Sequence, residues 1–273
     1  MEELPQKVVV GCICERLGNI MFQIGAYITY AKRYNRALFL AINEHDKRKL
    51  KEYRNYFELL DRFKFLDIKE LHRKYKNIGF YAETPKFDYE PIPDASNDIV
   101  SLVGYWQNED YFDKDLVKGF FRPSEEYKNL ILEKYGDLSE ATSISVRHGD
   151  DYVKQQDFFV VPSAKWYEDA YNTYFPGTKV IITSDDIEWA KENIHIKDAI
   201  FVEESDKVNV FWDLFTCSLC KNHITYPGTY GWMGAWLGEG EDSKVICPDK
   251  WWGPKNQGIS ENIVPKRWLR FKL

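Results

Sequence analysis

The fold is decided by the stretch that reads Ala141-Thr142-Ser143-Ile144-Ser145-Val146-Arg147-His148-Gly149-Asp150-Asp151-Tyr152. It begins with Ala141–Val146, which we interpret as a strand, and a run rich in β-branched residues lies over residues 179–183. Runs of this kind are typical of strands buried on both faces of a parallel sheet. A helical pattern over residues 163–174 separates the two runs. Strands that alternate with helices predict an α/β fold with a doubly wound parallel sheet.

The same alternation extends in both directions from this stretch. Toward the C-terminus we expect helices over 186–193, 208–220 and 230–237, and strands over 199–202, 223–226 and 244–247. Toward the N-terminus we expect strands over 7–13, 37–41 and 98–105, and helices over 20–34, within the highly charged segment 44–75, and from a cap at Ser124 to about Tyr135. Three prolines predict an irregular loop over residues 85–97.

The segment Gly136–Glu140 is a plausible domain boundary. We therefore predict two Rossmann-like domains, residues 1–138 and 139–273. Ligands of doubly wound sheets bind outside the carboxyl ends of the strands, so two such halves in series would face each other across an active-site cleft.

Composition and charge exclude several classes of protein. The chain of 273 residues carries 37 Lys and Arg against 43 Asp and Glu, for a formal net charge of −6, and shows no basic footprint for nucleic acid. No apolar run is long enough to span a membrane, and no signal segment opens the chain. Five cysteines are too few for a disulfide scaffold, so we expect a cytoplasmic protein. The aromatic content, 16%, is high, and we expect most of this group to lie in the core: Trp166, Trp189, Trp212, Trp232 and Trp236.

Three loops that follow predicted strands carry residues suited to binding an anion. Arg16 and Gly18 lie between the first strand and its helix, where backbone amides and a cation can approach a phosphate; a plain tight turn is the alternative. Arg147 ends a strand and can hold a phosphate bidentately, while the neighbouring Asp150 and Asp151 could supply a base. An Arg–Asp ion pair that caps the sheet explains the same residues equally well.

The third loop leads from Pro227 through Gly228 and Thr229 into a helix. Glycine permits a close backbone approach, and the threonine hydroxyl and first helical amides can bind a phosphate. The chain holds no dinucleotide-binding Gly-x-Gly-x-x-Gly, no P-loop and no serine-hydrolase elbow.

Metal binding has two candidate motifs, and for each we favour a structural role. A zinc site would need distant elements to bring together Cys12, Cys14, Cys217 and Cys220, so buried free thiols are the better interpretation. Ser184-Asp185-Asp186 ends a strand, as in Mn²⁺-dependent sugar transferases, but residues of this kind also cap helices, which we favour for Ser184 and Asp185.

These loops together resemble the α-1,2-fucosyltransferases, an inverting glycosyltransferase family. The resemblance runs from about residue 9 to residue 253. It is carried by the following segments in the family's order: Arg16–Gln23, Tyr105-Trp106-Gln107, Val146–Tyr152, Thr183–Trp189, Gly228–Leu237 and Cys247–Trp252. The blocks match in the family's order, which makes the resemblance specific, and they extend over most of the chain.

The resemblance implies a GT-B-type fold and inverting transfer of fucose from GDP-β-L-fucose to the 2-hydroxyl of a terminal β-galactoside, with no metal required. It implies that Arg147 neutralises the departing β-phosphate, that Asp213 reads the guanine edge and that Thr229 contacts the diphosphate. The resemblance also places the loop of Arg16, Gly18 and Asn19 beside the donor sugar. It implies that residues 1–138 form the acceptor-side domain and residues 139–273 the domain that binds GDP-fucose. We assign four further residues to the donor site: Ser145, His148, Asp185 and Gly228.

The remaining assignments concern the base and the acceptor. Asp150 is our candidate for the catalytic base, although it could instead orient Arg147, and we assign Asp151, Tyr152 and Trp106 to the acceptor. The family's second loop usually reads His-x-Arg-Arg-Gly-Asp, whereas Ser145 and His148 stand here for the first His and the second Arg. A transferase of another linkage or GDP-sugar, a non-catalytic sugar-binding relative and a metal-dependent enzyme remain alternatives. Peripheral membrane association is expected if the acceptor is lipid-linked.

Overall fold

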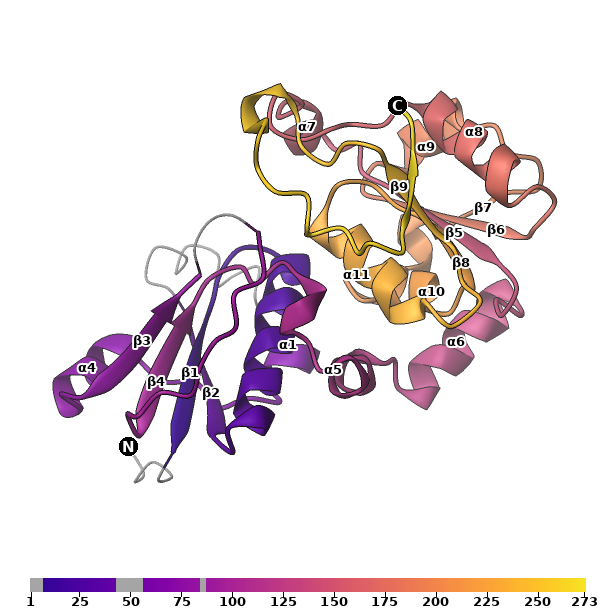
Figure 1. The fold of residues 1–273 in the computed structure, drawn as a ribbon. Helices are drawn as coiled ribbons and strands as arrows, with labels where there is room; N and C mark the ends of the chain where they lie inside the picture. Colours follow the sequence, from indigo (N-terminus) through magenta and orange to yellow (C-terminus); the bar gives the residue numbers. More distant parts are fainter. Residues whose placement is uncertain (1–6, 43–55, 84–86) are drawn as a thin grey trace. The chain divides into compact units, whose positions relative to one another are not determined.

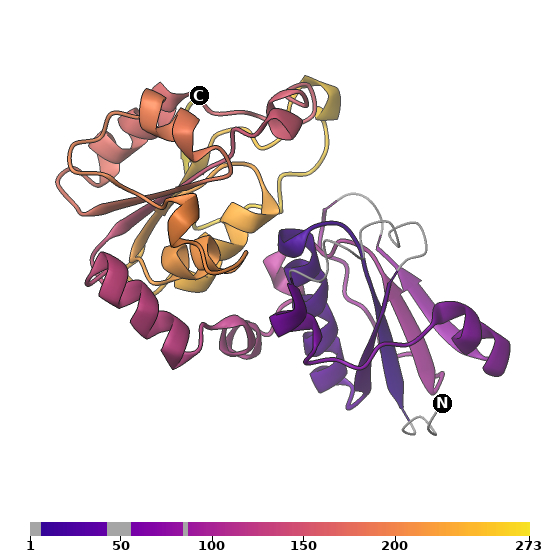
Figure 2. The same ribbon diagram turned by 180° about the vertical axis from the view of Figure 1, so that it is seen from behind.

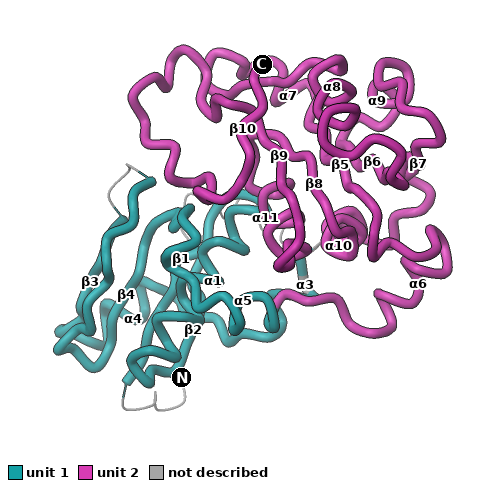
Figure 3. The backbone as a smooth tube through the Cα atoms, turned by 45° about the vertical axis from the view of Figure 1, so that its right-hand side comes forward, with its two compact units in different colours: residues 1–120 teal, residues 121–273 magenta. Residues whose placement is uncertain are grey.

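The computed structural model describes residues 7–42, 56–83 and 87–273. It contains two compact units, residues 1–120 and 121–273, which Figure 3 shows in different colours. Each unit is described by itself below.

The first unit is built on a four-stranded parallel sheet in the order β2-β1-β4-β3. Its helix α1 buries nearly every residue of its first three turns, which fits the apolar spacing of the sequence. The described elements are β1 (Val8–Ile13), α1 (Leu17–Arg33), β2 (Ala37–Ile42), α3 (Phe57–Leu60), α4 (Ile68–Lys74), β3 (Ile78–Ala82), β4 (Ile99–Val103), η3 (Glu109–Tyr111) and α5 (Lys114–Phe121).

The second unit holds a six-stranded parallel sheet in the order β10-β9-β8-β5-β6-β7. Helices α8 and α9 pack on one face of this sheet, and α10 and α11 lie on the other (Figures 1 and 2). The elements are α6 (Glu125–Tyr135), β5 (Thr142–Val146), α7 (Asp150–Val153), α8 (Ala164–Tyr174), β6 (Val180–Ser184), α9 (Ile187–Asn193), β7 (Ile200–Phe201), η4 (Glu204–Asp206), α10 (Trp212–Ser218), β8 (Asn222–Ile224), α11 (Thr229–Gly238), β9 (Val245–Pro248), η5 (Pro254–Asn256) and β10 (Leu269–Phe271).

Alternation along β5 sends its side chains to the two faces of the sheet. Ile144 and Val146 join the apolar cluster under α8 and α9, whereas Ser145 faces Cys217 of α10. Trp232 and Trp236 are fully buried on α11 and stack on each other. Packing on both faces of the sheet therefore holds β5, and with it the loop that follows Val146, in place.

The predicted alternation of strands and helices is confirmed, with some differences. Strands β3 and β10 and helices α5 and α7 were not expected, and α10 begins at Trp212 instead of residue 208. The expected helices of residues 44–75 lie partly outside the described residues.

The two units divide after residue 120, earlier than the expected boundary after residue 138. Helix α6 belongs to the second unit because its aromatic residues contact α10. The Trp212 indole donates to the Tyr135 hydroxyl at 3.1 Å, and Tyr127 packs against Phe215. The functions expected for the two domains stay predictions.

Candidate functional site

The carboxyl ends of β5, β6 and β8 meet at one edge of the second sheet. From β5 the chain runs to β6 and β7 on one side, and β8 then returns to pair with the other side of β5. This is a topological switch point, the place where open parallel sheets bind their ligands. The loops that follow these three strands contain Arg147, Asp185 and Gly228.

Arg147 is held by two carboxylates at this edge. Its Nη2 donates to both oxygens of Asp151, at 2.7 and 3.0 Å, and its Nη1 donates to Oδ2 of Asp185. The guanidinium carbon lies 5.5 Å from the centre of the Tyr152 ring, and the Arg147 side chain is 18% exposed. The side chain is thus oriented on three sides before any ligand arrives.

Asp185 fixes the loop that carries Arg147. Besides the guanidinium, its carboxylate accepts the backbone N–H groups of His148 and Gly149, each at 2.9 Å. A Cβ atom at Gly149 would lie only 2.2 Å from Asp185 Oδ2, so the close approach requires glycine. The capping role that we favoured for Asp185 is therefore wrong. The N-cap of α9 is Asp186, which accepts from the Trp189 amide.

His148 lies flat against Trp189. The two ring centres are 3.6 Å apart and the planes differ by 10°. His148 Nδ1 is buried, makes no hydrogen bond to a described residue and lies 3.7 Å from the Asp186 carboxylate. Trp189 is half-buried and packs against the core cluster of the second unit, so it lies at the rim of the core. Its ring also covers one face of His148.

Asp150 and Asp151 have different surroundings. The Asp150 side chain is 92% exposed and pairs with Lys154 at 2.7 Å, and this hydrogen bond lowers the pKa of Asp150. Asp151, which is 46% exposed, is the carboxylate on Arg147. The structure thus orients Arg147 through Asp151 and Asp185. The role of Asp150 as the base stays a prediction.

Ser145 and Tyr152 lie beneath the site. Ser145 is buried on β5, with its hydroxyl 3.5 Å from the Cys217 sulfur. Tyr152 is also buried, its ring lies under Arg147 and its hydroxyl donates to the Pro227 carbonyl, which ties α7 to the loop after β8. Both side chains support the loops, and their expected ligand contacts stay predictions.

The loop after β8 turns directly into α11. Gly228 is the N-cap and has no side chain to accept from the first helical amides, and Thr229 is the first helical residue. A Cβ atom at Gly228 would lie 2.1 Å from the Tyr226 ring. The structure therefore brings Gly228 and Thr229 to the same sheet edge as Arg147, as expected.

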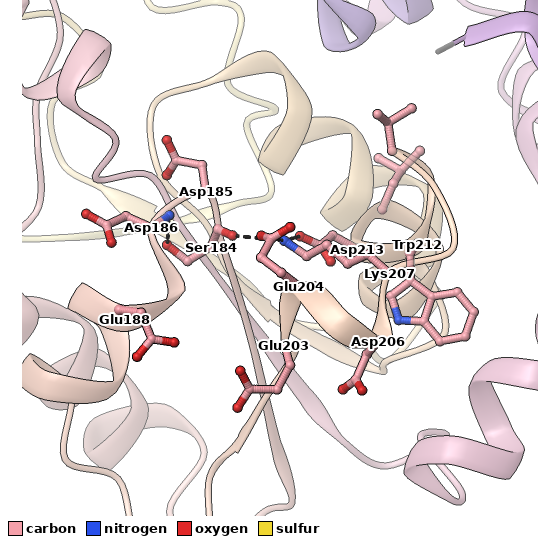
Figure 4. Close-up of polar contacts among 12 residues, drawn as sticks. Ser184, Asp185, Asp186, Glu188, Glu203, Glu204, Asp206, Lys207, Trp212 and Asp213 are labelled. Carbon is pink, nitrogen blue, oxygen red and sulfur yellow. Dashed lines mark hydrogen bonds and ion pairs between the residues drawn. The ribbon is translucent and has the colours of Figure 1, made fainter.

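Asp213 lies in the first turn of α10, beside a lysine that sequence reasoning missed. Lys207 Nζ lies 3.1 Å from Asp213 Oδ2 and donates to Glu204 at 2.6 Å and to the Ser184 carbonyl at 3.3 Å, as Figure 4 shows. The signal in the sequence is that Lys207 is the single basic residue between Asp198 and Cys220, within an acidic segment.

The predicted residues of the first unit lie near the start of α1. Arg16 is the exposed N-cap residue, Gly18 is buried in the first turn, and Asn19 accepts a hydrogen bond from Gln107 at 2.7 Å. Trp106 is buried, and its indole N–H donates to Tyr27 at 3.3 Å. Gly18 and Asn19 thus lie in the first turn of α1 and not in the expected loop, and Arg16 directly precedes them. Contact of these residues with the donor and of Trp106 with an acceptor stays a prediction.

Within residues 7–42, 56–83 and 87–273, no group of three or more His, Cys, Asp or Glu side chains is placed to hold a metal ion. Among the helices of the same ranges, none combines the length and the apolar character needed to cross a membrane.

The class of protein follows from the sheet edge together with sequence comparison. A family profile described as glycosyl transferase family 11 matches residues 7–271. The chain therefore belongs to glycosyl transferase family 11, and the expected family is confirmed.

Two curated relatives are similar to this chain over nearly its whole length, and solved structures share its fold. The chain is 28% identical to the O-antigen biosynthesis glycosyltransferase WbnK of Escherichia coli, over 90% of this chain and 95% of that protein. It is 26% identical to an alpha-1,2-colitosyltransferase of Escherichia coli, over 97% and 99%. The structure resembles NodZ alpha-1,6-fucosyltransferase soaked with GDP-fucose, with a TM-score of 0.51, 13% identity and coverage of 85% and 93%. A structure of NodZ from Bradyrhizobium gives a TM-score of 0.52 at 12% identity, over 84% and 93%. The predicted GT-B-type α/β fold is confirmed.

Proposed function

We propose that this glycosyltransferase transfers L-fucose from GDP-β-L-fucose to the 2-hydroxyl of a terminal β-galactoside, with inversion at the anomeric carbon. The observation that carries the proposal is Arg147, oriented at the switch point beside the N-terminus of α11 in a member of glycosyl transferase family 11. A cation and helical amides at one sheet edge suit a diphosphate. The likeness to fucosyltransferase structures supports the fold on which this site is built.

The proposed role of Arg147 is to stabilise charge on the β-phosphate as GDP departs. Stabilisation of developing charge by a fixed group is usually the largest catalytic contribution. Asp151 occupies Nη2 and is half-exposed, so a phosphate could displace it while Asp185 keeps the guanidinium in place. Arg147 would then supply at this edge the positive charge that a metal ion provides in other transferases, and we propose a metal-independent reaction.

We keep Asp150 as the proposed base for the acceptor hydroxyl. Its carboxylate is exposed, and its lowered pKa keeps it ionised at neutral pH, although Lys154 must release it first. A weak base of this kind suits a displacement in which the proton leaves late. Asp151 is the alternative base and would first have to leave Arg147.

The acceptor glycan and the location of the enzyme belong to the same proposal. We propose a galactose-terminated glycan as the acceptor, with the partly exposed Asp151 as its candidate contact in the second unit, and a cytoplasmic enzyme that associates with a membrane surface if that glycan is lipid-linked. The relation to an O-antigen biosynthesis glycosyltransferase supports a glycan of bacterial surface type.

A second donor is favoured by one comparison. The alpha-1,2-colitosyltransferase aligns with 97% of this chain, and colitose is fucose without its 3-hydroxyl. GDP-colitose is therefore the second candidate donor, with the same linkage.

The test combines a donor screen with variants of Arg147. Purified enzyme is incubated with a β-galactoside acceptor and GDP-fucose, GDP-colitose, GDP-mannose or UDP-galactose, with and without EDTA, and the product linkage is determined by NMR. We expect α-1,2-fucosylation that survives EDTA, its loss in Arg147→Ala and its retention in Arg267→Ala, a control whose guanidinium pairs with Glu239 instead. Transfer from another donor alone, or full activity of Arg147→Ala, would refute the proposal.

A further inference from the structure

Lys207 is a mostly buried cation next to the switch point, and the proposed reaction gives it no role. Figure 4 shows it between the end of β6 and the start of α10. Its ammonium group is held by the Ser184 carbonyl at 3.3 Å and by Glu204 at 2.6 Å, and it lies 3.1 Å from Asp213 Oδ2. Three contacts from three segments leave this ammonium group little freedom.

Asp213 itself is 12% exposed and has one oxygen in use. Its Oδ2 faces Lys207, whereas Oδ1 is buried without a hydrogen-bond partner among the described residues. A carboxylate can accept about four hydrogen bonds, and a buried acceptor left without a donor destabilises the protein. An N–H group of a ligand would remove this penalty.

The other groups that face Asp213 supply no second cation. Tyr135 of α6 donates its hydroxyl to Asp206 at 3.2 Å, and Tyr230 of α11 donates to the Val210 carbonyl at 2.6 Å. Cys217 on α10 and Glu204 add no positive charge. Among the described residues that face it, Lys207 is thus the one positive group near the carboxylate.

We propose that Lys207 is the positioning residue for Asp213: it anchors Oδ2 and leaves both lone pairs of Oδ1 to accept the N1–H and the 2-amino group of the donor's guanine. The inference rests on the proposed function and on the role that the family resemblance implies for Asp213, which is to bind that base. Guanine presents two adjacent donors, the N1–H and the 2-amino group, and hypoxanthine lacks the 2-amino group. A fixed and ionised carboxylate would therefore distinguish GDP from IDP.

The ionisation of Asp213 gives Lys207 a second effect. Burial raises the pKa of Asp213 to about 6, and the neighbouring Lys207 opposes that rise. Removing the lysine would raise this pKa further, because burial would then act without an opposing cation. The carboxylate must be ionised to accept two N–H groups, so binding of the base weakens as the pH falls through the pKa.

The experiment measures nucleotide binding by calorimetry in wild type, Lys207→Met, Lys207→Arg and the control Lys191→Met. Lys191 forms ion pairs with Glu188 and Glu203 of the same unit and has no contact with Asp213. GDP and IDP are compared at pH 7.5. GDP-fucose is then titrated from pH 5 to 8.5, because its diphosphate has no ionisation in that range.

We expect wild type to prefer GDP over IDP by about tenfold or more, as a site built to hydrogen-bond a ligand group does. Lys207→Met should reduce GDP affinity about tenfold, bring the GDP/IDP ratio close to one and move the pH midpoint for GDP-fucose upward by about one unit. Lys207→Arg should restore most of the ratio, and Lys191→Met should match wild type.

Two results would contradict these expectations, and they refute different claims. If wild type binds GDP and Lys207→Met keeps its affinity, ratio and pH midpoint, the role of Lys207 is refuted while the proposed function stands. If wild type binds no guanine nucleotide, the proposed donor fails and this inference with it. Should Lys207→Met not fold, Lys207→Gln is measured in its place, and an unchanged ratio there refutes the proposal.

Discussion

Replacing Gly149 by alanine tests how tightly the Arg147 loop is held. A Cβ atom at this position would lie 2.2 Å from Asp185 Oδ2, so the carboxylate must move by roughly 1 Å to reach ordinary contact. The backbone at Gly149 has φ −59°, which alanine adopts without strain. The effect of the substitution therefore arises mainly from the displaced Asp185 carboxylate, with a smaller contribution from Asp151 Oδ1, which would lie 3.2 Å from the Cβ atom.

The displacement breaks hydrogen bonds that the structure defines. Oδ2 accepts from the Gly149 amide at 2.9 Å and from Arg147, and a hydrogen bond to a charged group contributes about 1.5–3 kcal/mol. Asp185 is partly exposed, so we take the lower end, about 1.5 kcal/mol. Since 1.36 kcal/mol is a factor of ten in rate, kcat/KM for transfer should fall about tenfold or more. The melting temperature should fall by about 3–6 °C, because a domain of this size shifts about 2–4 °C per kcal/mol.

The assay follows kcat/KM with GDP-fucose and the melting temperature of the same preparations. Gly240→Ala is the matched control, because a Cβ atom there would lie 3.6 Å from its nearest neighbour. Wild-type kcat/KM together with a wild-type melting temperature for Gly149→Ala would show that Asp185 does not hold the loop.

Three further predictions concern single side chains. Asp150→Asn should lower kcat more than donor affinity, whereas Asp151→Asn should alter donor affinity through Arg147; equal kinetics of both variants and wild type would remove both roles. Burial raises the pKa of Asp213 from 3.8 to about 6, so between about pH 4 and pH 6 the native state holds a proton that the unfolded state has released. The free energy of unfolding of wild type should therefore fall relative to that of Asp213→Asn as the pH rises from about 4 to 6, by at most about 3 kcal/mol. Urea unfolding of both proteins at the two pH values checks the sign. Trp236→Ala should lower the free energy of unfolding by about 3–5 kcal/mol, because the ring is fully buried against Trp232, and a loss below 1 kcal/mol in urea unfolding would contradict the packing.

Strand positions were predictable because their signal is local. Val180–Ser184 is a short run buried on both faces and therefore consists mostly of β-branched residues, while Thr142–Val146, which is equally buried, keeps Ile144 and Val146 on one face and two serines on the other. The strand Leu269–Phe271 was missed because it has three residues, two of them exposed, and no apolar run to detect. The helix caps at Ser124 and Ser163 were also readable, since a serine before a helical pattern accepts from an amide three residues on.

The partners of the site residues were less predictable because they depend on contacts distant in sequence. Asp185 and Asp186 are neighbours of the same type, and only the fold shows that the first binds Arg147 and the second caps α9. The burial of Trp106 and Tyr152 is likewise set by tertiary packing. Lys207 was missed because its partner Asp213 becomes adjacent only when the segment after η4 turns into α10.

The strand order of the second sheet has a consequence for synthesis of the chain. All four strands of the first sheet end by residue 103, so that sheet can form early, as N-terminal domains generally do during translation. Strand β5, in contrast, pairs on one side with β8, residues 222–224, which are synthesised about 80 residues later. Until β8 is available, the backbone N–H and C=O groups on that side of β5 are unpaired, which favours aggregation. Fragments that stop before residue 222 should therefore be poorly soluble, and slow elongation through this segment should lower the yield of folded protein.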